Sequence, residues 1–183
     1  MKVHQTKLPG VLIIEFDRFA DSRGSFFESW HREKYAKLGI DRDFVQDNLS
    51  TSAKGVLRGL HFQNPHPQGK LVQVLEGEVF DVAVDIRIGS PTFKEWFGMN
   101  LSASGNKQLY IPEGFAHGFV VLSDSATFMY KCTDTYMKDC EKTIRWDDRE
   151  IGIVWPISNP ILSDKDRLGL RLSEISQLDL PKA

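Results

Sequence analysis

The sequence has no long apolar segment and no apolar leader. Although 41% of its 183 residues are hydrophobic, nothing approaches the roughly 18 consecutive apolar residues of a membrane-spanning helix. The first ten residues, MKVHQTKLPG, also lack the apolar centre of a signal peptide. We therefore expect a cytoplasmic protein that makes no contact with a membrane.

An excess of one charge is missing, and cysteine is scarce. The chain has 23 Lys and Arg against 25 Asp and Glu, without a long basic run, which disfavours a nucleic-acid partner. Its only cysteines, Cys132 and Cys140, form no CxxC pair, so we expect reduced thiols and neither a redox nor a zinc site. There is no internal repeat, low-complexity tract or linker, and the length predicts one domain over residues 1–183.

Short apolar segments separated by turn residues make up most of the chain. They predict strands over residues 11–16, 24–30, 93–101, 107–111, 117–122, 126–133 and 143–146, and a hairpin with its turn at Glu76-Gly77. A short helix is expected over 31–38, ending at Gly39, and a helical turn capped by Ser163 near the C-terminus. This pattern is typical of an all-β sandwich or barrel.

The second strand of that hairpin has two different faces. By the two-residue period, its apolar face carries Phe80, Val82, Val84 and Ile86, and its other face carries Val79, Asp81, Ala83, Asp85 and Arg87. The apolar face is expected in a core. The mixed face fits either solvent or a wet cavity, and the sequence does not choose between them for Asp81 and Asp85.

Charged groups interrupt segments that otherwise suit a core. The stretch GVLRGLH contains Arg58 and His61, and Lys70 follows in the next strand. Such groups are costly to bury, so they are either exposed or line a pocket. If they line a pocket, Arg58 and Lys70 suit an anionic ligand such as a diphosphate.

GLHFQ and PEGFAHGF resemble the two motifs of the cupin superfamily of small jelly-roll β-barrels. Metal-binding cupins carry His-x-His in the first motif, but here the sequence is His61-Phe62-Gln63. His61 and His117 are then left beside Lys70, whose charge opposes a cation. We therefore expect no metal, with the two histidines free for acid–base work or phosphate contact.

A base alone does not invert a carbon next to a ketone efficiently, because an acid is needed on the other face. In the strand over 126–133, Tyr130 shares a face with Phe128 and Cys132, while Lys131 points away. A phenol among apolar neighbours that opens on a pocket is a reasonable proton donor. Asp166 is a candidate to orient His61, although no spacing rule links the two.

Taken together, several motifs resemble the dTDP-4-dehydrorhamnose 3,5-epimerase family in their order along the chain. They are FDRFADSRGSFFESW, FVQDNLS, GVLRGLHFQ, QGKLVQVLEGEVFDVAVDIRIGSPTF, QLYIPEGFAHGFVVLSD, YKCTDTY and IGIVWP. The resemblance implies a cupin-type jelly-roll β-barrel that inverts C3 and C5 of dTDP-4-dehydro-6-deoxy-D-glucose without a cofactor. It also implies a homodimer, with the N-terminal strands (about 1–50) packing on the partner subunit.

The resemblance further assigns roles to individual residues. It implies that His61 is the base and Tyr130 the acid, that Asp166 pairs with His61, and that Lys70 stabilises the enolate. The substrate-binding residues that it implies are Arg23, Glu28, Gln46, Asp47, Asn48, Arg58, His117, Tyr136, Glu141 and Lys165. Tyr136 would stack on thymine, and Arg58 and His117 would meet the diphosphate. The chain departs from the family pattern at residues 138–140, beside Tyr136.

Three other functions remain open at this point. An epimerase that inverts only C3 or C5 of another dTDP-4-keto-6-deoxysugar needs nearly the same residues. A cupin that binds a sugar nucleotide without turnover would not need both His61 and Tyr130. A metal-dependent cupin oxygenase or isomerase is disfavoured because the second histidine of the first motif is missing.

Overall fold

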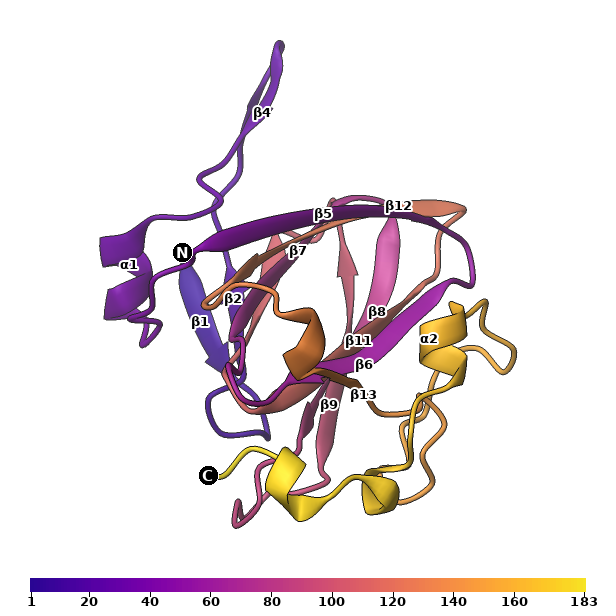
Figure 1. Cartoon of the computed structure of the whole chain (residues 1–183). Coiled ribbons are helices and arrows are strands. Elements are labelled where there is room, and N and C mark those ends of the chain that lie inside the picture. The colour runs from indigo at the N-terminus through magenta and orange to yellow at the C-terminus, as the bar shows by residue number, and fades with distance from the viewer.

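The computed structural model describes all residues, 1–183, and consists mainly of two facing antiparallel β-sheets (Figure 1). The six-stranded sheet has the order β1 (Lys2–Gln5), β2 (Leu12–Glu15), β10 (Lys107–Ile111), β7 (Lys70–Glu76), β12 (Ser125–Cys132) and β5 (Gln46–Ala53). The five-stranded sheet has the order β13 (Glu141–Thr143), β6 (Leu57–Gln63), β11 (Phe115–Val121), β8 (Glu78–Asp85) and β9 (Trp96–Ser102). From β5 to β8 and from β10 to β13, successive strands alternate between the sheets, which gives the expected cupin-type jelly roll.

Three apolar cores hold these layers. The first lies between the sheets and includes Val72, Leu109 and Phe128 from one sheet and Val79 and Phe119 from the other. The second joins the five-stranded sheet to the C-terminal segment, and the third joins the six-stranded sheet to α1 (Arg32–Lys37). Both sheets are therefore covered on two faces over part of their length.

Most of the strands expected from the sequence are confirmed, with shifted ends. The expected strand over 24–30 is wrong beyond its first residues, because only β4 (Gly24–Phe26) is a strand and it pairs with β3 (Phe19–Asp21). The expected strand over 143–146 is instead β13, which begins two residues earlier and already ends at Thr143. β5 was not expected, because its polar sequence, QDNLSTSA, carries no apolar alternation.

The short helices form where the sequence suggests. Helix α1 ends before Gly39, whose φ of +93° suits glycine at a helix terminus. Helix α2 (Asp164–Arg167) begins at Ser163, whose hydroxyl accepts a hydrogen bond from the Asp166 N–H. Three single-turn 3₁₀ helices, η1 (Lys138–Cys140), η2 (Leu172–Glu174) and η3 (Gln177–Asp179), complete the chain. No helix is both long and apolar enough to span a bilayer.

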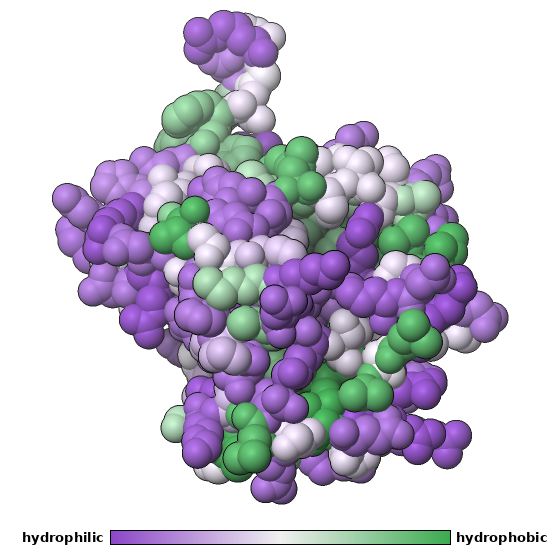
Figure 2. All heavy atoms as spheres, in the orientation of Figure 1, coloured by the Kyte–Doolittle hydropathy of each residue, from purple (hydrophilic) through white to green (hydrophobic).

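The β3–β4 hairpin projects away from the two sheets (Figure 1). Its paired aromatic side chains, Phe19 and Phe26, are 66% and 69% exposed. Its tip is hydrophilic, and hydrophobic residues lie nearer the body (Figure 2). A two-stranded ribbon of this kind has little stability of its own in water.

The mixed face of β8 points into the protein rather than to solvent. Val79 and Ala83 lie in the first core, and Asp81 and Asp85 are both fully buried. Asp85 is satisfied by Arg87, Ser90 and Thr92, so it stabilises the turn after β8. Asp81 has a different partner, described below.

Candidate active site

A cavity of about 360 Å³ opens between the two sheets. It is lined by Gln46, Asn48, Ser50, Arg58, His61, Phe62, Gln63, Gln68, Lys70, His117, Phe119, Tyr130, Tyr136, Glu141 and Lys165. Ten of these side chains were predicted from the sequence as catalytic or substrate-binding. The lining is mostly polar, which suits a charged and hydroxylated ligand better than an apolar one.

One side of the cavity, here called the regular wall, consists of β5, β12 and β7. The pairing of β12 with β7 shifts only between Thr127 and Phe128 and is regular from Phe128 to Cys132, where the wall faces the cavity. Their register places residues of one face in rows across the three strands. One row is Gln46, Cys132 and Lys70, and the next is Asn48, Tyr130 and Val72. The two-residue period, together with the register of β12 on β7, brings the predicted acid and the predicted enolate-stabilising cation to one face.

The other side, here called the bulged wall, consists of β6 and β11. Arg58 and His61 are three residues apart, so a regular strand would point them to opposite faces. Both line the cavity because the pairing shifts between Phe119↔Arg58 and His117↔His61. Within that interval β6 contributes two residues and β11 only one, which is the pattern of a β-bulge.

His61 is held by Asp166 from helix α2. The His61 Nε2–Asp166 Oδ1 distance is 2.6 Å, and the Ser163 hydroxyl donates to the other carboxylate oxygen at 2.7 Å. Asp166 is only 3% exposed. Burial alone would raise the pKa of Asp166, but the hydrogen bonds from His61 and Ser163 hold it below its ordinary value. An ionised Asp166 favours a proton on Nε2, which leaves Nδ1 as the basic nitrogen.

The cavity also lowers the pKa of two of its basic side chains, His61 and Lys70. Burial lowers the pKa of His61, and this effect outweighs the opposite effect of Asp166. Burial likewise lowers the pKa of Lys70, which forms no ion pair and is 8% exposed. A histidine with a lowered pKa is neutral near pH 7 and can accept a proton. The side-chain nitrogen of Lys70 has no carboxylate partner.

Tyr130 lies in the regular wall, close to Lys70. The Lys70 Nζ is 6.0 Å from the centre of the Tyr130 ring, and the Phe128 ring centre is also 6.0 Å away. Burial raises the pKa of Tyr130, so its phenol stays protonated near pH 7. Tyr130 can therefore donate a proton to a group bound in the cavity.

The rim of the cavity is a short polar chain from Tyr136 to Lys165. Glu141 accepts a hydrogen bond from the Tyr136 hydroxyl at 2.9 Å and pairs with Lys165 at 2.8 Å. Burial alone would raise the pKa of Glu141, but Lys165 and Tyr136 hold it below its ordinary value. The Tyr136 side chain is half exposed, so its ring is available to a ligand at the rim.

His117 forms a second histidine–carboxylate pair. Its Nε2 lies 2.9 Å from Asp81 Oδ2, and both residues are buried. Asp81 can therefore be buried on the inner face of β8, because His117 provides its hydrogen-bond partner. His117 faces the cavity across the strand pair from His61.

Several lining residues were not predicted as site residues from the sequence. Phe62, Gln63, Gln68 and Phe119 line the cavity, as does Ser50, whose hydroxyl has no partner within the protein. The glutamines also fix the loop that carries Tyr136. Gln63 accepts from the Met137 N–H at 2.7 Å, and Gln68 donates to the Asp134 carbonyl at 2.8 Å.

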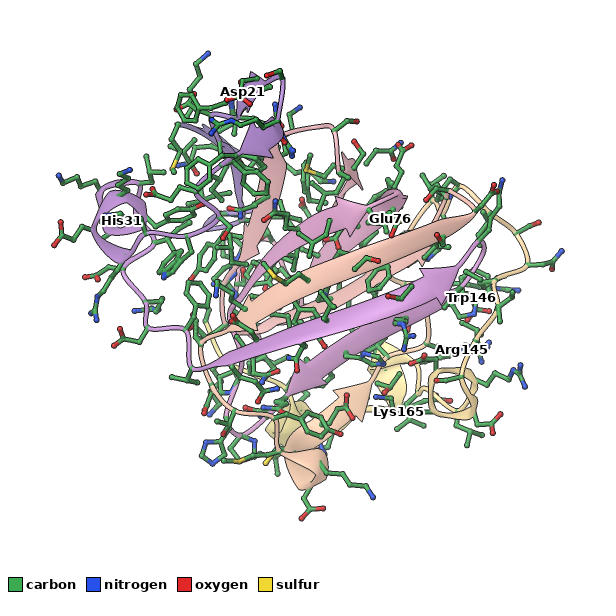
Figure 3. The ribbon with its side chains drawn as sticks, turned by 90° about the horizontal axis from the view of Figure 1, so that it is seen from above. Asp21, His31, Glu76, Arg145, Trp146 and Lys165 are labelled. Carbon is green, nitrogen blue, oxygen red and sulfur yellow. The ribbon has the colours of Figure 1, made fainter.

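Three of the predicted binding residues lie outside the cavity. Arg23 pairs with Asp21 on the projecting hairpin, and Glu28 pairs with Lys34 of helix α1. Asp21, the partner of Arg23, lies far from Lys165 at the rim of the cavity when the molecule is viewed from above (Figure 3). Asp47 points to the outer face of the regular wall and pairs with Lys131 at 2.7 Å, because it alternates with Gln46 and Asn48.

The donors needed for a metal ion do not come together. No group of three or more His, Cys, Asp or Glu side chains has the geometry to hold one. Instead, His61 and His117 each form a hydrogen bond with a carboxylate, from Asp166 and Asp81 respectively. The two cysteines, Cys132 and Cys140, are free thiols.

Comparison with known proteins identifies the relatives of this chain. The sequence profile of the dTDP-4-dehydrorhamnose 3,5-epimerase family matches residues 5–174. A dTDP-4-dehydrorhamnose 3,5-epimerase from Shigella flexneri is 56% identical over 168 residues, covering 91% of this chain and 93% of that protein. A dTDP-4-dehydrorhamnose 3-epimerase from Streptomyces niveus is 39% identical over 176 residues, covering 95% and 85%.

A solved structure agrees over the whole chain. It is the crystal structure of a dTDP-6-deoxy-D-glucose-3,5-epimerase from Legionella pneumophila Philadelphia 1 in complex with dTDP-4-keto-L-rhamnose. The TM-score is 0.97 at 49% sequence identity, and the match covers 100% of this chain and 98% of that one. Sequence, fold and cavity agree, and the chain belongs to the dTDP-4-dehydrorhamnose 3,5-epimerase family of isomerases.

Proposed function

We propose that this protein inverts C3 and C5 of dTDP-4-dehydro-6-deoxy-D-glucose, without a cofactor, to give dTDP-4-dehydro-L-rhamnose. The observation that carries this proposal is that His61 and Tyr130 line one cavity from its two different walls. A base and an acid on opposite sides of a bound sugar are what inversion next to a ketone requires. The names of the relatives support the substrate.

In the proposed reaction, Nδ1 of His61 removes the proton from a carbon beside the C4 ketone. The electron pair of the broken C–H bond moves onto the C4 oxygen, and the Lys70 ammonium stabilises the resulting enolate. Tyr130 then delivers its proton to the opposite face of the same carbon, and the enolate returns to the ketone. The imidazolium loses its proton and the phenolate regains one from solvent, so the protein is unchanged at the end.

The two carbons to be inverted flank one ketone, so one enolate-stabilising group serves both. We propose that Lys70 holds the C4 oxygen while C3 and C5 react in turn. Support comes from its free amine, its burial and its position one row from Tyr130. Lys165 cannot take this role, because its amine is paired with Glu141 at the rim.

We assign the nucleotide to the remaining lining residues. Arg58, which makes no ion pair in this subunit and only donates to the Ser52 hydroxyl at 3.0 Å, is placed to meet the diphosphate. Tyr136 at the rim would stack on thymine, with His117, Gln46 and Asn48 as further polar contacts. Glu141 and Lys165 would then act by holding Tyr136 and closing the rim.

We also propose that the protein works as a homodimer in which residues 1–50 pack on the partner. The projecting hairpin supports this, because Phe19 and Phe26 are exposed on a ribbon that is not stable alone. Arg23 and Glu28 would then serve the partner's cavity.

Mixing two variants that we expect to be inactive, Arg23→Ala and His61→Ala, tests whether the hairpin of one subunit reaches the cavity of the other. A mixed dimer regains one complete site and activity if the hairpin crosses, and no activity returns if it does not.

The test of the function is proton NMR of the dTDP-4-keto-6-deoxyglucose substrate in deuterated water with the purified protein. We expect deuterium at both C3 and C5 and a product of L configuration, trapped by a reductase. Deuterium at a single carbon would assign the protein to the single-carbon epimerases, of which the Streptomyces niveus relative is named as one. No exchange at either carbon would leave a cupin that binds sugar nucleotides without turnover.

A further inference from the structure

The bulged wall contains a backbone contact that the reaction chemistry does not explain. Gly118 on β11 lies directly against Gly59 on β6, at the point where the strand pairing shifts. A Cβ placed on Gly118 would lie 2.8 Å from the Arg58 carbonyl oxygen and 3.2 Å from the Gly59 Cα. A Cβ on Gly59 would lie 2.6 Å from the Gly118 Cα. The two strands therefore approach more closely here than any residue with a side chain allows.

The two glycines are constrained in different ways. Gly59 has a φ of +124°, a conformation that other residues rarely adopt. Gly118 has no such conformation, so only the close approach requires a glycine there. Replacing Gly118 therefore tests the contact itself, separately from the backbone conformation.

The residues after the bulge have further anchors besides this contact, which the Leu60 side chain also touches: a Cβ on Gly118 would lie 3.1 Å from Leu60 Cδ2. Leu60 and Ile144 exchange two backbone hydrogen bonds, at 3.0 and 2.9 Å, and the Leu60 side chain lies in the second core. His61 is paired to Thr143 in β13 and to Asp166 in α2. Before the bulge, by contrast, the only side-chain bond of Arg58 is to Ser52. A wider strand separation at Gly118 would therefore move Arg58 more than His61.

We propose that Gly118 is a positioning residue: its contact with Gly59 holds the bulge that turns Arg58 into the same cavity as His61. This inference rests on the proposed function, in which Arg58 anchors the diphosphate and His61 acts on the sugar. The contact sets the distance between the anchor and the base. An anchor displaced by about 1 Å can cost on the order of 10²-fold in rate, because the bound sugar is misplaced at the base.

The test is a double-mutant cycle between Gly118→Ala and Arg58→Ala, measured as kcat/KM per folded protein. We expect Gly118→Ala to lower kcat/KM by ~10²-fold alone, but by less than ~3-fold when Arg58 is already Ala. The matched control is Leu101→Ala, a buried residue of β9 in the first core, whose effect should be the same in both backgrounds. Equal losses from Gly118→Ala in both backgrounds would overturn the proposal.

A second variant covers the case in which Gly118→Ala does not fold. Leu60→Ala loosens the bulge from the core side without adding an atom to the cavity, and its effect should also shrink when Arg58 is Ala. An effect that is independent of Arg58 would contradict the proposal. Normal turnover by His61→Ala would instead contradict the proposed function, so the two failures are distinguishable.

Discussion

The two walls of the cavity deliver their functional groups in different ways. In the regular wall, strand alternation and register place Lys70 and Tyr130 on one face, with Asn48 in the same row as Tyr130. In the bulged wall, alternation is broken, and Arg58 and His61 share a face across a shift in pairing, where β6 has an extra residue. A regular strand thus positions groups by sequence spacing, whereas a bulge positions them through contacts made elsewhere in the fold.

The largest effect is expected at the base in the bulged wall. His61→Ala should lower turnover by about 10²- to 10⁴-fold, the usual contribution of a general base. Binding of dTDP should be largely kept, because Arg58 and Tyr136 are untouched. Steady-state kinetics and titration calorimetry measure the two quantities. His4→Ala, an exposed histidine of β1, is the control, and normal turnover by His61→Ala would show that the base lies elsewhere.

The regular wall should respond differently. Tyr130→Phe removes the proton donor but not the base, so inversion should slow by ~10²-fold, while exchange of the substrate α-protons with solvent continues. Proton NMR in deuterated water separates the two rates. Lys131→Ala, in the same strand but with its side chain on the outer face, is the control. An equal loss of exchange and inversion would give Tyr130 a structural role instead.

A smaller effect is expected at the carboxylate that orients His61. Burial holds the pKa of His61 below its ordinary value, so the acid limb of kcat/KM should lie below about pH 6.5. Asp166→Asn removes a group that raises this pKa, so the limb should move to still lower pH while kcat falls by about 10- to 10²-fold. A pH profile measures both. Asp164→Asn, exposed on the same helix, should change neither, and an upward shift for Asp166→Asn would contradict the assignment.

The lowered pKa of His61 also makes the stability of the protein depend on pH. Between its lowered pKa in the folded state and about 6.5 in the unfolded state, the unfolded chain binds more protons at this site. The contribution of His61 to the free energy of unfolding therefore falls as the pH drops through that window. Denaturant titrations at several pH values should show a weaker dependence in His61→Ala. An unchanged dependence would mean that His61 titrates normally in the folded protein.

The smallest expected effect concerns two adjacent residues of β5, Asp47 and Asn48. Asn48 faces the cavity and Asp47 the outer face, so Asn48→Ala should raise KM by ~10-fold through a lost hydrogen bond to a charged ligand. Asp47→Ala breaks only a surface pair with Lys131 and should change KM less than ~2-fold. Substrate-saturation curves for the two variants test whether strand alternation decides which side chains of β5 contact the substrate. A larger effect of Asp47→Ala than of Asn48→Ala on KM would contradict this.

Several features of this fold could be predicted because they are local. Alternation predicted most strands, Ser163 predicted the start of α2, and the face shared by Tyr130 and Cys132 was predicted from the two-residue period. β5 was missed because its polar residues carry no hydrophobic signal, although they line the cavity. The role of β8 as an inner strand was undecided, since an acid such as Asp81 suits solvent equally well until its partner His117 is known.

The sequence by itself determined the residue types of the site, the all-β class and, through motifs in their order, the family. The tertiary structure decided which of those residues meet. Asp166 reaches His61 across 105 positions of sequence, Arg58 joins His61 where the strand pairing shifts, and Asp47, Arg23 and Glu28 lie outside the cavity. The physical reason is range: backbone period and capping act over a few residues, whereas register, bulges and long-range ion pairs depend on every strand that packs around them.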